Sequence, residues 1–370
     1  MNILLGGRYA APNSGNFIAS LLELGNYLKA RGHGVCYAFT KCEHTMKPGG
    51  WVNWLEKNGF TVYLVDEQAS DESQLSELKG ILEKEKIDIF HSHFWLFHSI
   101  IVNYRNELPV KILLHEHMER PAWFGRFKYW KKMMLRSAMY RKKHISIICV
   151  NKKVSRCHRL TQHWWVPNGL SFLRNVDKST SREECRNSLH IPPDEKIVLF
   201  MGHNPSQKGL DIAVRAIEKL QDESMSVKLG LLGFGANPSG DRLKVLEKII
   251  KNENDRNALF CLEGGEDMFA LHRAADCYLS ASRSESFSYG LIEAISQNTP
   301  IVVSNIRGTR WSAEFSNSYF YPVEDPDACA EQIKNALKTG RIESNYEEII
   351  EKYSIDKWCE RILQIYKKLM

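Results

Sequence analysis

Two glutamates eight residues apart, Glu285 and Glu293, lie in a stretch whose pattern suits the binding of a phosphorylated ligand (YLSASRSESFSYGLIEAISQNTPIVVS, residues 278–304). The spacing allows one carboxylate to extend from a loop and the other to rise from the first turns of the helix that follows. Between them, the free N–H groups and the dipole of the helix N-terminus favour phosphate. Ionised carboxylates only accept hydrogen bonds and so suit vicinal sugar hydroxyls. A diphosphate flanked by hydroxyls describes a nucleotide sugar; the alternative is a surface loop with two solvated glutamates.

The elements that must position these carboxylates are a strand, a loop and a helix. The apolar run at 278–281 predicts a strand, the helix begins near Tyr289, and Pro300 separates it from a second buried strand at 301–303. Apolar strands that alternate with helices indicate a parallel sheet covered on both faces. In such sheets, ligands bind beyond the carboxyl ends of the strands.

The same alternation begins at the start of the chain. Residues 2–5 predict a strand, GGRYAAPNSGN a glycine-rich turn, and FIASLLELGNYLKA a helix. Gly15 in this turn would let a ligand approach the backbone closely, although the segment could also be only a tight strand–helix turn. The pattern is not G-x-G-x-x-G, so we expect no nicotinamide site. Further strands are predicted at 35–39, 61–65, 87–90, 110–114 and 145–150.

Two of these predicted strands end in histidine pairs, His91 with His93 and His115 with His117. Each pair could hold a metal ion. However, residues two apart point the same way only while a strand continues, and the sequence shows no third ligand. We therefore interpret the histidines as hydrogen-bonding groups at a ligand site and predict no metal.

The chain length and the amino-acid composition predict a globular protein of two domains. The chain has 370 residues, of which 43% are hydrophobic and 25% charged. It contains no apolar run of the about 18 residues that a membrane helix needs. The first residues lack the basic start and long apolar core of a signal peptide, and the nine cysteines form no CxxC pair. These features predict a cytoplasmic protein with reduced thiols.

Positive charge is concentrated in one segment. Residues 120–176 contain fourteen Lys and Arg and no Asp or Glu, so this part should face an anionic partner. Within it, residues 121–144 could form a packed helix with a solvated basic face. The reading that we favour is a membrane-facing basic region at 120–160 that binds anionic lipid. The aromatic side chains that suggest this contact are Trp123, Phe124, Phe127, Tyr129 and Trp130.

The pattern S-x-x-E-x-F-x-x-x-x-x-E-A, followed by a Pro and a short apolar strand, resembles the E-x7-E signature of retaining glycosyltransferases with the GT-B fold, especially glycosyltransferase family four. Other family landmarks occur in the family's order over nearly the whole chain. They include a Pro-Asn-Gly segment at 167–169 and GHNPSQKG at 202–209. The resemblance implies an α/β protein with two Rossmann-like domains that face each other across a cleft. The implied parts are an N-terminal acceptor-binding domain at 1–172, a C-terminal nucleotide-sugar-binding domain at 190–350, and a helix at 353–370 that crosses back to the first domain.

The resemblance also implies roles for individual residues. Glu285 would hold hydroxyls of the donor sugar, Glu293 those of the ribose, and Lys208 the diphosphate. His115 matches a histidine beside the sugar being transferred, and His93 resembles a second histidine of the cleft. The implied catalytic residues are thus His115, Glu285 and Lys208.

One position departs from the family pattern. His203 stands where the family has an arginine, so a partly protonated imidazole replaces a permanent, bidentate charge. This substitution leaves more of the diphosphate to Lys208. The implied donor-binding residues are Gly15, His203, Lys208, Gly233, Gly235, Ser286, Phe287, Tyr289, Gly290 and Glu293.

The implied reaction transfers a sugar from a nucleoside diphosphate donor, with UDP as the expected nucleotide, to a hydroxyl acceptor, with retention of the anomeric configuration. We expect no cofactor or metal, because helix N–H groups and a lysine can stabilise the departing diphosphate. The expected acceptor is a lipid-linked or other cell-surface glycan precursor, which would place the protein at the inner face of a membrane. The donor sugar, the linkage and the oligomeric state stay open.

Two other functions remain as alternatives. Nucleotide-sugar epimerases share the fold and would convert the donor without an acceptor. A non-catalytic basic module for nucleic acid would explain residues 120–176 but not the paired glutamates, so we predict no nucleic-acid partner. Asp325-Pro-Asp327 resembles the DxD metal motif of the other glycosyltransferase fold, but it precedes a helix and predicts a helix cap.

Overall fold

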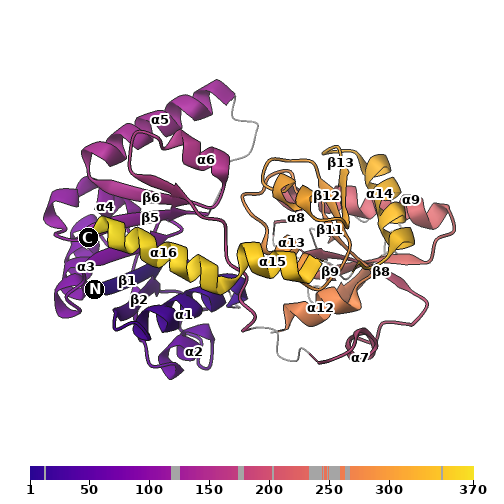
Figure 1. The fold of residues 1–370 in the computed structure, drawn as a ribbon, viewed down its shortest axis with the longest axis horizontal. Coiled ribbons are helices and arrows are strands. Elements are labelled where there is room, and N and C mark those ends of the chain that lie inside the picture. The colour runs from indigo at the N-terminus through magenta and orange to yellow at the C-terminus, as the bar shows by residue number, and fades with distance from the viewer. Residues whose placement is uncertain are drawn as a thin grey trace. The chain divides into compact units, whose positions relative to one another are not determined.

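The chain folds into two compact units, and each has its own parallel sheet (Figure 1). The first unit comprises Met1–Ser171 and Tyr353–Met370, and the second comprises Phe172–Lys352. Three residues of the expected donor site, His203, Gly233 and Gly235, lie outside the described part of the chain. The computed structural model describes residues 1–11, 14–117, 126–173, 179–201, 204–232, 244, 246–247, 249, 259–262, 267–342 and 345–370.

The sheet of the first unit has seven strands in the order β3-β2-β1-β4-β5-β6-β7. The order reverses between β1 and β4, which makes this the switch point, the place where ligands bind in open α/β sheets. The strands are β1 (Asn2–Gly7), β2 (Gly34–Thr40), β3 (Thr61–Val65), β4 (Ile89–His93), β5 (Lys111–Glu116), β6 (Ile145–Cys149) and β7 (His163–Trp165). The helices are α1 (Gly15–Lys29), α2 (Trp51–Lys57), α3 (Asp71–Lys84), α4 (His98–Asn103), α5 (Arg126–Lys142), α6 (Lys152–Cys157) and α16 (Ile355–Leu369).

Helices cover both faces of this sheet, which explains why its strands are almost continuously apolar. In β1, Ile3 and Leu5 pack in one core with α1, α2 and α16, whereas Leu4 packs in the other core with α3, α4 and α5. Figure 1 shows α16, in yellow, beside α1. The last helix of the chain therefore completes the core of the first unit.

The second unit repeats the same layout with six parallel strands in the order β10-β9-β8-β11-β12-β13. Its switch point lies between β8 and β11. The strands are β8 (Lys196–Met201), β9 (Val227–Leu232), β10 (Leu259–Leu262), β11 (Cys277–Ser280), β12 (Ile301–Ser304) and β13 (Ser318–Tyr321). The helices are α7 (Arg182–Ser188), α8 (Pro205–Lys208), α9 (Leu210–Asp222), α12 (Met268–Ala274), α13 (Tyr289–Ser296), α14 (Pro326–Thr339) and α15 (Asn345–Tyr353).

The predicted fold class is confirmed, because both units are parallel α/β sheets with helices. The cap predicted at Asp325 is also confirmed: its side chain accepts a hydrogen bond from the N–H of Ala328 at the start of α14. None of the described helices combines the length and apolar character that crossing a membrane requires.

The histidine-bearing strands are longer than predicted. The expected ends were residues 90 and 114, but β4 continues to His93 and β5 to Glu116. Parallel pairing extends into these ends, with His93 opposite His115. His91, His93 and His115 are therefore inside the sheet rather than in the loops after it, because their backbones join the ladder while their rings are buried. His117 directly follows the end of β5.

Candidate functional site

The switch point of the second unit brings together the lysine and the first glutamate predicted from the sequence. Lys208 closes α8, which follows β8, and Glu285 lies in the loop after β11. Because β8 and β11 are neighbours in the sheet, their carboxyl ends share one edge. The Lys208 Nζ forms an ion pair with Oε1 of Glu285. These two side chains are 28% and 13% exposed, so a ligand can still reach them.

The backbone of this loop is tied to α8 by several contacts. The Arg283 N–H donates to the carbonyl of Gln207 at 2.8 Å, and the Gln207 side chain donates to the carbonyl of Ser284 at 3.2 Å. The Arg283 guanidinium forms an ion pair with Asp211 at 2.8 Å, at the start of α9. Lys208 and Glu285 are thus held together by their backbones as well as by their charges.

Two glycines allow the chain to pass this close. Gly209 has a left-handed φ of 72°, and a Cβ on it would collide with the carbonyl of Ala281. A Cβ on Gly308 would collide with the carbonyl of Glu285. Any side chain at either position would move the loop that carries Glu285.

The second glutamate lies at the buried side of the same region. Glu293 projects from α13 and is only 4% exposed, with its Oε2 3.6 Å from Nε2 of His272. Burial, with added repulsion from Glu285 and Glu293, raises the pKa of Tyr278. The N-cap Ser288 makes no side-chain cap to α13, so the first-turn N–H groups are not satisfied by that residue.

The other predicted donor contacts shape the turn into α13. Phe287 stacks on Trp311, with ring centroids 4.6 Å apart. Tyr289 is the first residue of α13, and Gly290 leaves room for the Tyr278 hydroxyl. Ser286 is buried between Glu285 and this turn. The arrangement offers one accessible carboxylate, one lysine and one buried carboxylate around a helix N-terminus, which suits a ligand with a diphosphate and hydroxyls.

The first unit gathers its predicted residues at its own switch point. Gly15 opens α1 with a φ of 55°, after β1. Two residues later, the Phe17 ring contacts the rings of His93 and His117, with centroids 5.4 Å away in each case. His115 is 3% exposed and stacks on His117 with centroids 4.3 Å apart. The glycine turn and the histidines therefore share one edge of the sheet.

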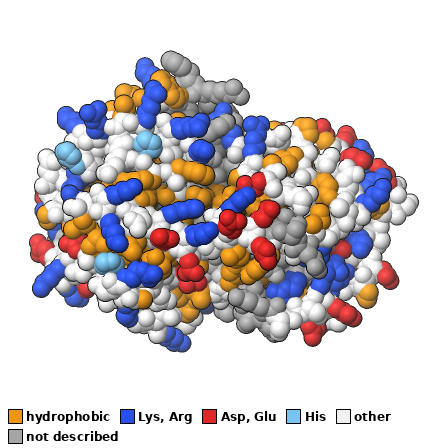
Figure 2. Space-filling view, viewed as in Figure 1, with side chains coloured by type: hydrophobic (Ala, Val, Ile, Leu, Met, Phe, Trp, Pro, Cys, Tyr) orange, Lys and Arg blue, Asp and Glu red, His pale blue; other side chains and the backbone are white. Residues whose placement is uncertain are grey.

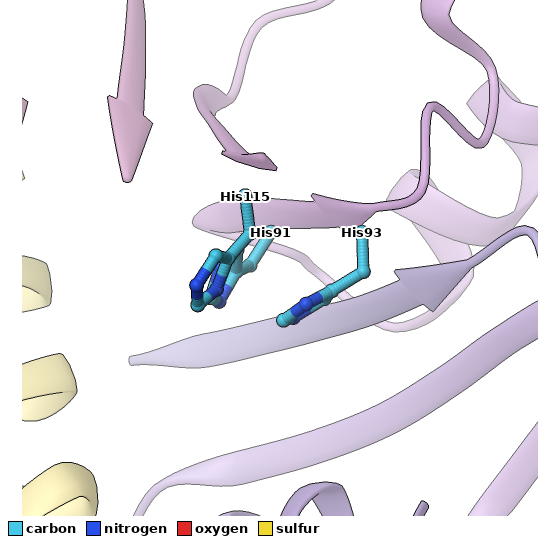
Figure 3. A group of neighbouring side chains, drawn as sticks. All are labelled: His91, His93 and His115. Carbon is cyan, nitrogen blue, oxygen red and sulfur yellow. The ribbon is translucent and has the colours of Figure 1, made fainter. Parts of the chain in front are cut away.

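All four histidines of the two pairs belong to one group. Burial lowers the pKa of His91, His93 and His115 well below the ordinary value, and neighbouring histidines add to the effect. Burial also lowers the pKa of His117 to about 3. The rings are therefore neutral near pH 7. The sequence predicted two separate pairs, whereas the register of β4 and β5 brings them together. Figure 3 shows three of the four rings, those of His91, His93 and His115.

A second buried polar group was missed by the sequence reasoning. On the opposite face of the sheet, Oε2 of Glu116 lies 3.1 Å from Nε2 of His158, and Cys149 lies beside them. Burial raises the pKa of the Cys149 thiol well above its ordinary value, and Glu116 adds to the shift. One signal was present in the sequence. Glu116 stands between His115 and His117, so in a continuing strand it must face the other way.

Within the basic segment, residues 126–142 form α5, which exposes both basic and hydrophobic side chains. Trp130 is 44% exposed and Leu135 64% exposed, and Figure 2 shows Lys and Arg side chains interleaved with hydrophobic ones over this helix. On the inner side, Met133 and Tyr140 are buried. Of the other aromatic residues named from the sequence, Trp123 and Phe124 lie outside the described residues, and the side chains of Phe127 and Tyr129 do too.

Comparison with known proteins points to one class of enzyme. Residues 181–355 match the family model for glycosyl transferases group 1. An uncharacterized glycosyltransferase of Methanocaldococcus jannaschii is 24% identical over 80% of this chain and 79% of its own length. The D-inositol 3-phosphate glycosyltransferase of Mycolicibacterium smegmatis is 24% identical over 60% of this chain, which spans about half (52%) of that relative.

A solved structure extends the similarity over the whole chain. The crystal structure of HepE from Anabaena in complex with UDP-glucose is 16% identical, with a TM-score of 0.78 and coverage of 100% of both chains. At this identity the likeness concerns the fold. Together, the matched family model, the relatives and the two parallel α/β units support a glycosyltransferase with the GT-B fold.

Proposed function

We propose that this protein transfers a sugar from a UDP-sugar to a hydroxyl acceptor and retains the anomeric configuration. The observation that carries the proposal is the Lys208–Glu285 pair at the switch point of the second unit, beside the start of α13, which Ser288 does not cap with its side chain. A lysine for the diphosphate and a carboxylate for sugar hydroxyls are the two groups that a nucleotide-sugar donor needs. The UDP-glucose complex of HepE, which shares the fold, is consistent with this donor class.

The donor would replace the contact between these two side chains. Its diphosphate takes the positive charge of Lys208 and the N–H groups at the start of α13, and Glu285 then accepts hydrogen bonds from the sugar. As the bond from the sugar to the diphosphate breaks, negative charge grows on the departing oxygens. Fixed positive groups stabilise that charge more than the ground state, which lowers the barrier. In this scheme, transfer needs no metal ion.

Glu293 would bind the ribose hydroxyls of the same donor. Its carboxylate is buried beside His272, so its orientation is restricted before any ligand arrives. In the first unit, we propose that His115 contributes a neutral imidazole to recognition of the sugar and that Gly15 allows close approach to the backbone. These roles rest on the resemblance to the family of the segment that ends in His115-Glu-His117 and of the glycine-rich turn that contains Gly15.

The proposed acceptor is a lipid-linked or cell-surface glycan precursor, reached from an anionic membrane surface. The support is the surface of α5, where Lys131 and Lys132 are exposed beside Trp130 and Leu135. Apolar side chains that insert between headgroups and lysines that attract anionic lipid together favour peripheral binding.

A donor screen tests the proposal directly. The thermal midpoint of the protein is measured with a panel of UDP-sugars and with the matching GDP-, ADP- and CMP-sugars. We expect UDP-sugars to raise the midpoint most, and one of them to release UDP when an acceptor extract is added. Retention is then read from the anomeric signal of the product by NMR. If the sugar is altered without any acceptor, the enzyme is an epimerase, and if no nucleotide sugar binds, the proposal fails.

A further inference from the structure

The histidines at the ends of β4 and β5 form a compact buried group. His91, His93 and His115 are 0%, 0% and 3% exposed, and one ring nitrogen of each lies within 4.8 Å of the others (Figure 3). His91 and His93 are two residues apart on one strand, and His115 lies opposite His93 on the next. All three side chains therefore share the face of the sheet that α1 and α16 cover.

Several nitrogens in this group have no hydrogen-bond partner among the residues that the structure describes. They are Nε2 of His91, Nε2 of His93 and both ring nitrogens of His115, and each is buried. Native structures leave few buried polar atoms unsatisfied, because such an atom loses its bonds to water without replacement. Buried nitrogens on three adjacent rings are therefore available to a common ligand.

The remaining nitrogens are placed as they are in metal sites. Nδ1 of His91 lies 2.6 Å from the Tyr366 hydroxyl, and Nδ1 of His93 lies 2.8 Å from Nε2 of His117. If Nδ1 carries the proton in His91 and His93, Nε2 of each ring keeps a lone pair for a ligand. Metal-bound histidines are typically oriented by such a bond from the second ring nitrogen.

We propose that His91, His93 and His115 bind a divalent transition-metal ion of the Zn²⁺ class, with water in the fourth position. His115 would use one ring nitrogen for the metal, which leaves its other nitrogen for the sugar contact proposed above. Three imidazoles favour Zn²⁺, Co²⁺ or Ni²⁺ over the oxygen-seeking Mg²⁺ and Ca²⁺. Tetrahedral Zn–N bonds place ligand nitrogens roughly 3.3 Å apart, so the rings must turn inward from their present spacing. The stacking of His91 on His115, with centroids 5.3 Å apart, gives way in that movement.

Another buried group, formed by Glu116, Cys149 and His158, also carries atoms that could bind a metal, but it is a weaker candidate. Its Glu116 and His158 already bond each other at 3.1 Å, and Arg136 lies 4.0 Å from the same carboxylate. Burial also keeps the Cys149 thiol protonated, whereas a metal needs the thiolate. The ligand atoms of this group are therefore largely satisfied by one another.

Cobalt titration of the full-length protein, freed of any affinity tag and treated with chelator, tests the site without relying on turnover. We expect one equivalent of Co²⁺ to give visible d–d absorption without a near-ultraviolet thiolate band, and Zn²⁺ to displace it. His91→Gln should weaken binding at least tenfold. His158→Gln is the matched control in the other group and should bind as the wild type does.

A second variant, Tyr366→Phe, separates loss of metal binding from misfolding, which could also explain weak binding by His91→Gln. It keeps all three imidazoles and the packing of the ring but removes the hydroxyl that orients His91, so binding should weaken about tenfold or more while circular dichroism stays unchanged. Unchanged Co²⁺ affinity in both Tyr366→Phe and His91→Gln would overturn the proposal. So would a wild type that binds no Co²⁺ at about 100 µM, or a thiolate band that His158→Gln abolishes.

Discussion

Lys208 and Glu285 form a partly exposed ion pair, and solvent screening limits what such a pair adds to stability, to about 0–1 kcal/mol. Its stronger effect is on the electrostatics of the switch point. In the proposed function, the two opposite charges lie side by side until a donor with both phosphate and hydroxyl groups separates them. The pair is therefore interpreted as part of a binding site more readily than as a fold-stabilising contact.

Removing either charge should slow glycosyl transfer far more than it alters stability. We expect Lys208→Met and Glu285→Gln each to reduce kcat/KM more than tenfold, because each removes a group that acts on the donor in the transition state. The control is Lys219→Met, which breaks an exposed ion pair with Asp327 in the same unit. Wild-type rates in Glu285→Gln would contradict the assigned role.

His98 should make the protein less stable in acid. Burial lowers its pKa to about 4, and Arg136 and Arg8 add to the shift, while its ring hydrogen-bonds the Tyr140 hydroxyl at 2.9 Å. The unfolded chain takes up the proton near pH 6.5 and the folded chain only near 4. Stability is thus lost as pH falls from about 6.5 to 4, by ~1–2 kcal/mol because the ring is partly exposed. Urea unfolding at pH 7 and 4.5 should show a smaller loss in His98→Gln, and equal losses would refute this.

Sequence patterns identified individual polar residues better than their partners. Glu285 and Glu293 could be named from their spacing in a strand–loop–helix stretch, and Lys208 from the resemblance of GHNPSQKG to the family. That Lys208 reaches Glu285, 77 residues further on, depends on β8 lying next to β11. Spacing along the chain does not contain this strand order. The partner of Glu293, His272, was missed for the same reason, since it arrives on α12.

At the scale of elements, the junction of α8 and α9 positions Lys208 through Gly209. Gly209→Ala should destabilise the protein by ~2–4 kcal/mol, since it adds both a left-handed φ for alanine and a collision with Ala281. Donor affinity should fall as well, because Ala281 leads into the loop of Glu285. Gly32→Ala is the control: its φ is 77°, but a Cβ there meets nothing within 4 Å, so only about 1 kcal/mol should be lost. Thermal unfolding with and without UDP compares them.

Helix α5 should bind anionic vesicles through its exposed face. Co-sedimentation with phosphatidylglycerol-containing vesicles should capture the wild type at low salt and release it at high salt, because lysines and apolar side chains act together. The double variant Trp130→Ser/Leu135→Ser should lose most of this binding. Met46→Ser, which removes a side chain that is 52% exposed elsewhere in the first unit, should not. Equal capture of both variants would exclude α5 as the contact.

Strands were predictable where they are uniformly apolar and less so where they carry function. The pattern predicted residues 61–65, and β3 spans Thr61–Val65. It ended β4 and β5 too early, because a histidine in a sequence predicts a loop unless its ring is buried. The ladder between the strands decides this point, and the pairing of His93 with His115 is tertiary information. The same strand pairing brings the histidines into one group, which could not be predicted from two separate pairs in the sequence.

At the scale of the whole molecule, each unit has its own core, and the chain returns to the first one at its end. The two chain segments of the first unit meet where the Leu170 N–H donates a hydrogen bond to the carbonyl of Tyr353 at 2.8 Å. Gly169 then allows close packing, since a Cβ there would lie 2.6 Å from Cβ of Trp358 in α16. The alternation of strands and helices predicted parallel α/β sheets, and chain length and the family resemblance predicted two domains, but no local pattern specifies the face on which α16 packs.

Truncating a buried side chain of α16 should therefore lower the stability of the first unit, although the strands of that unit are distant from α16 in sequence. Ile362 is 0% exposed in the core shared with α1 and β1, so Ile362→Ala should cost ~2–5 kcal/mol. Hydrogen exchange should speed up in peptides from β1 and β4. Ile333→Ala in α14 is the matched control, because Ile333 is equally buried in the core of the second unit and its loss should speed exchange in β8 and β9 instead. If Ile362→Ala chiefly accelerated exchange in β8 and β9, α16 would not be acting as part of the first core.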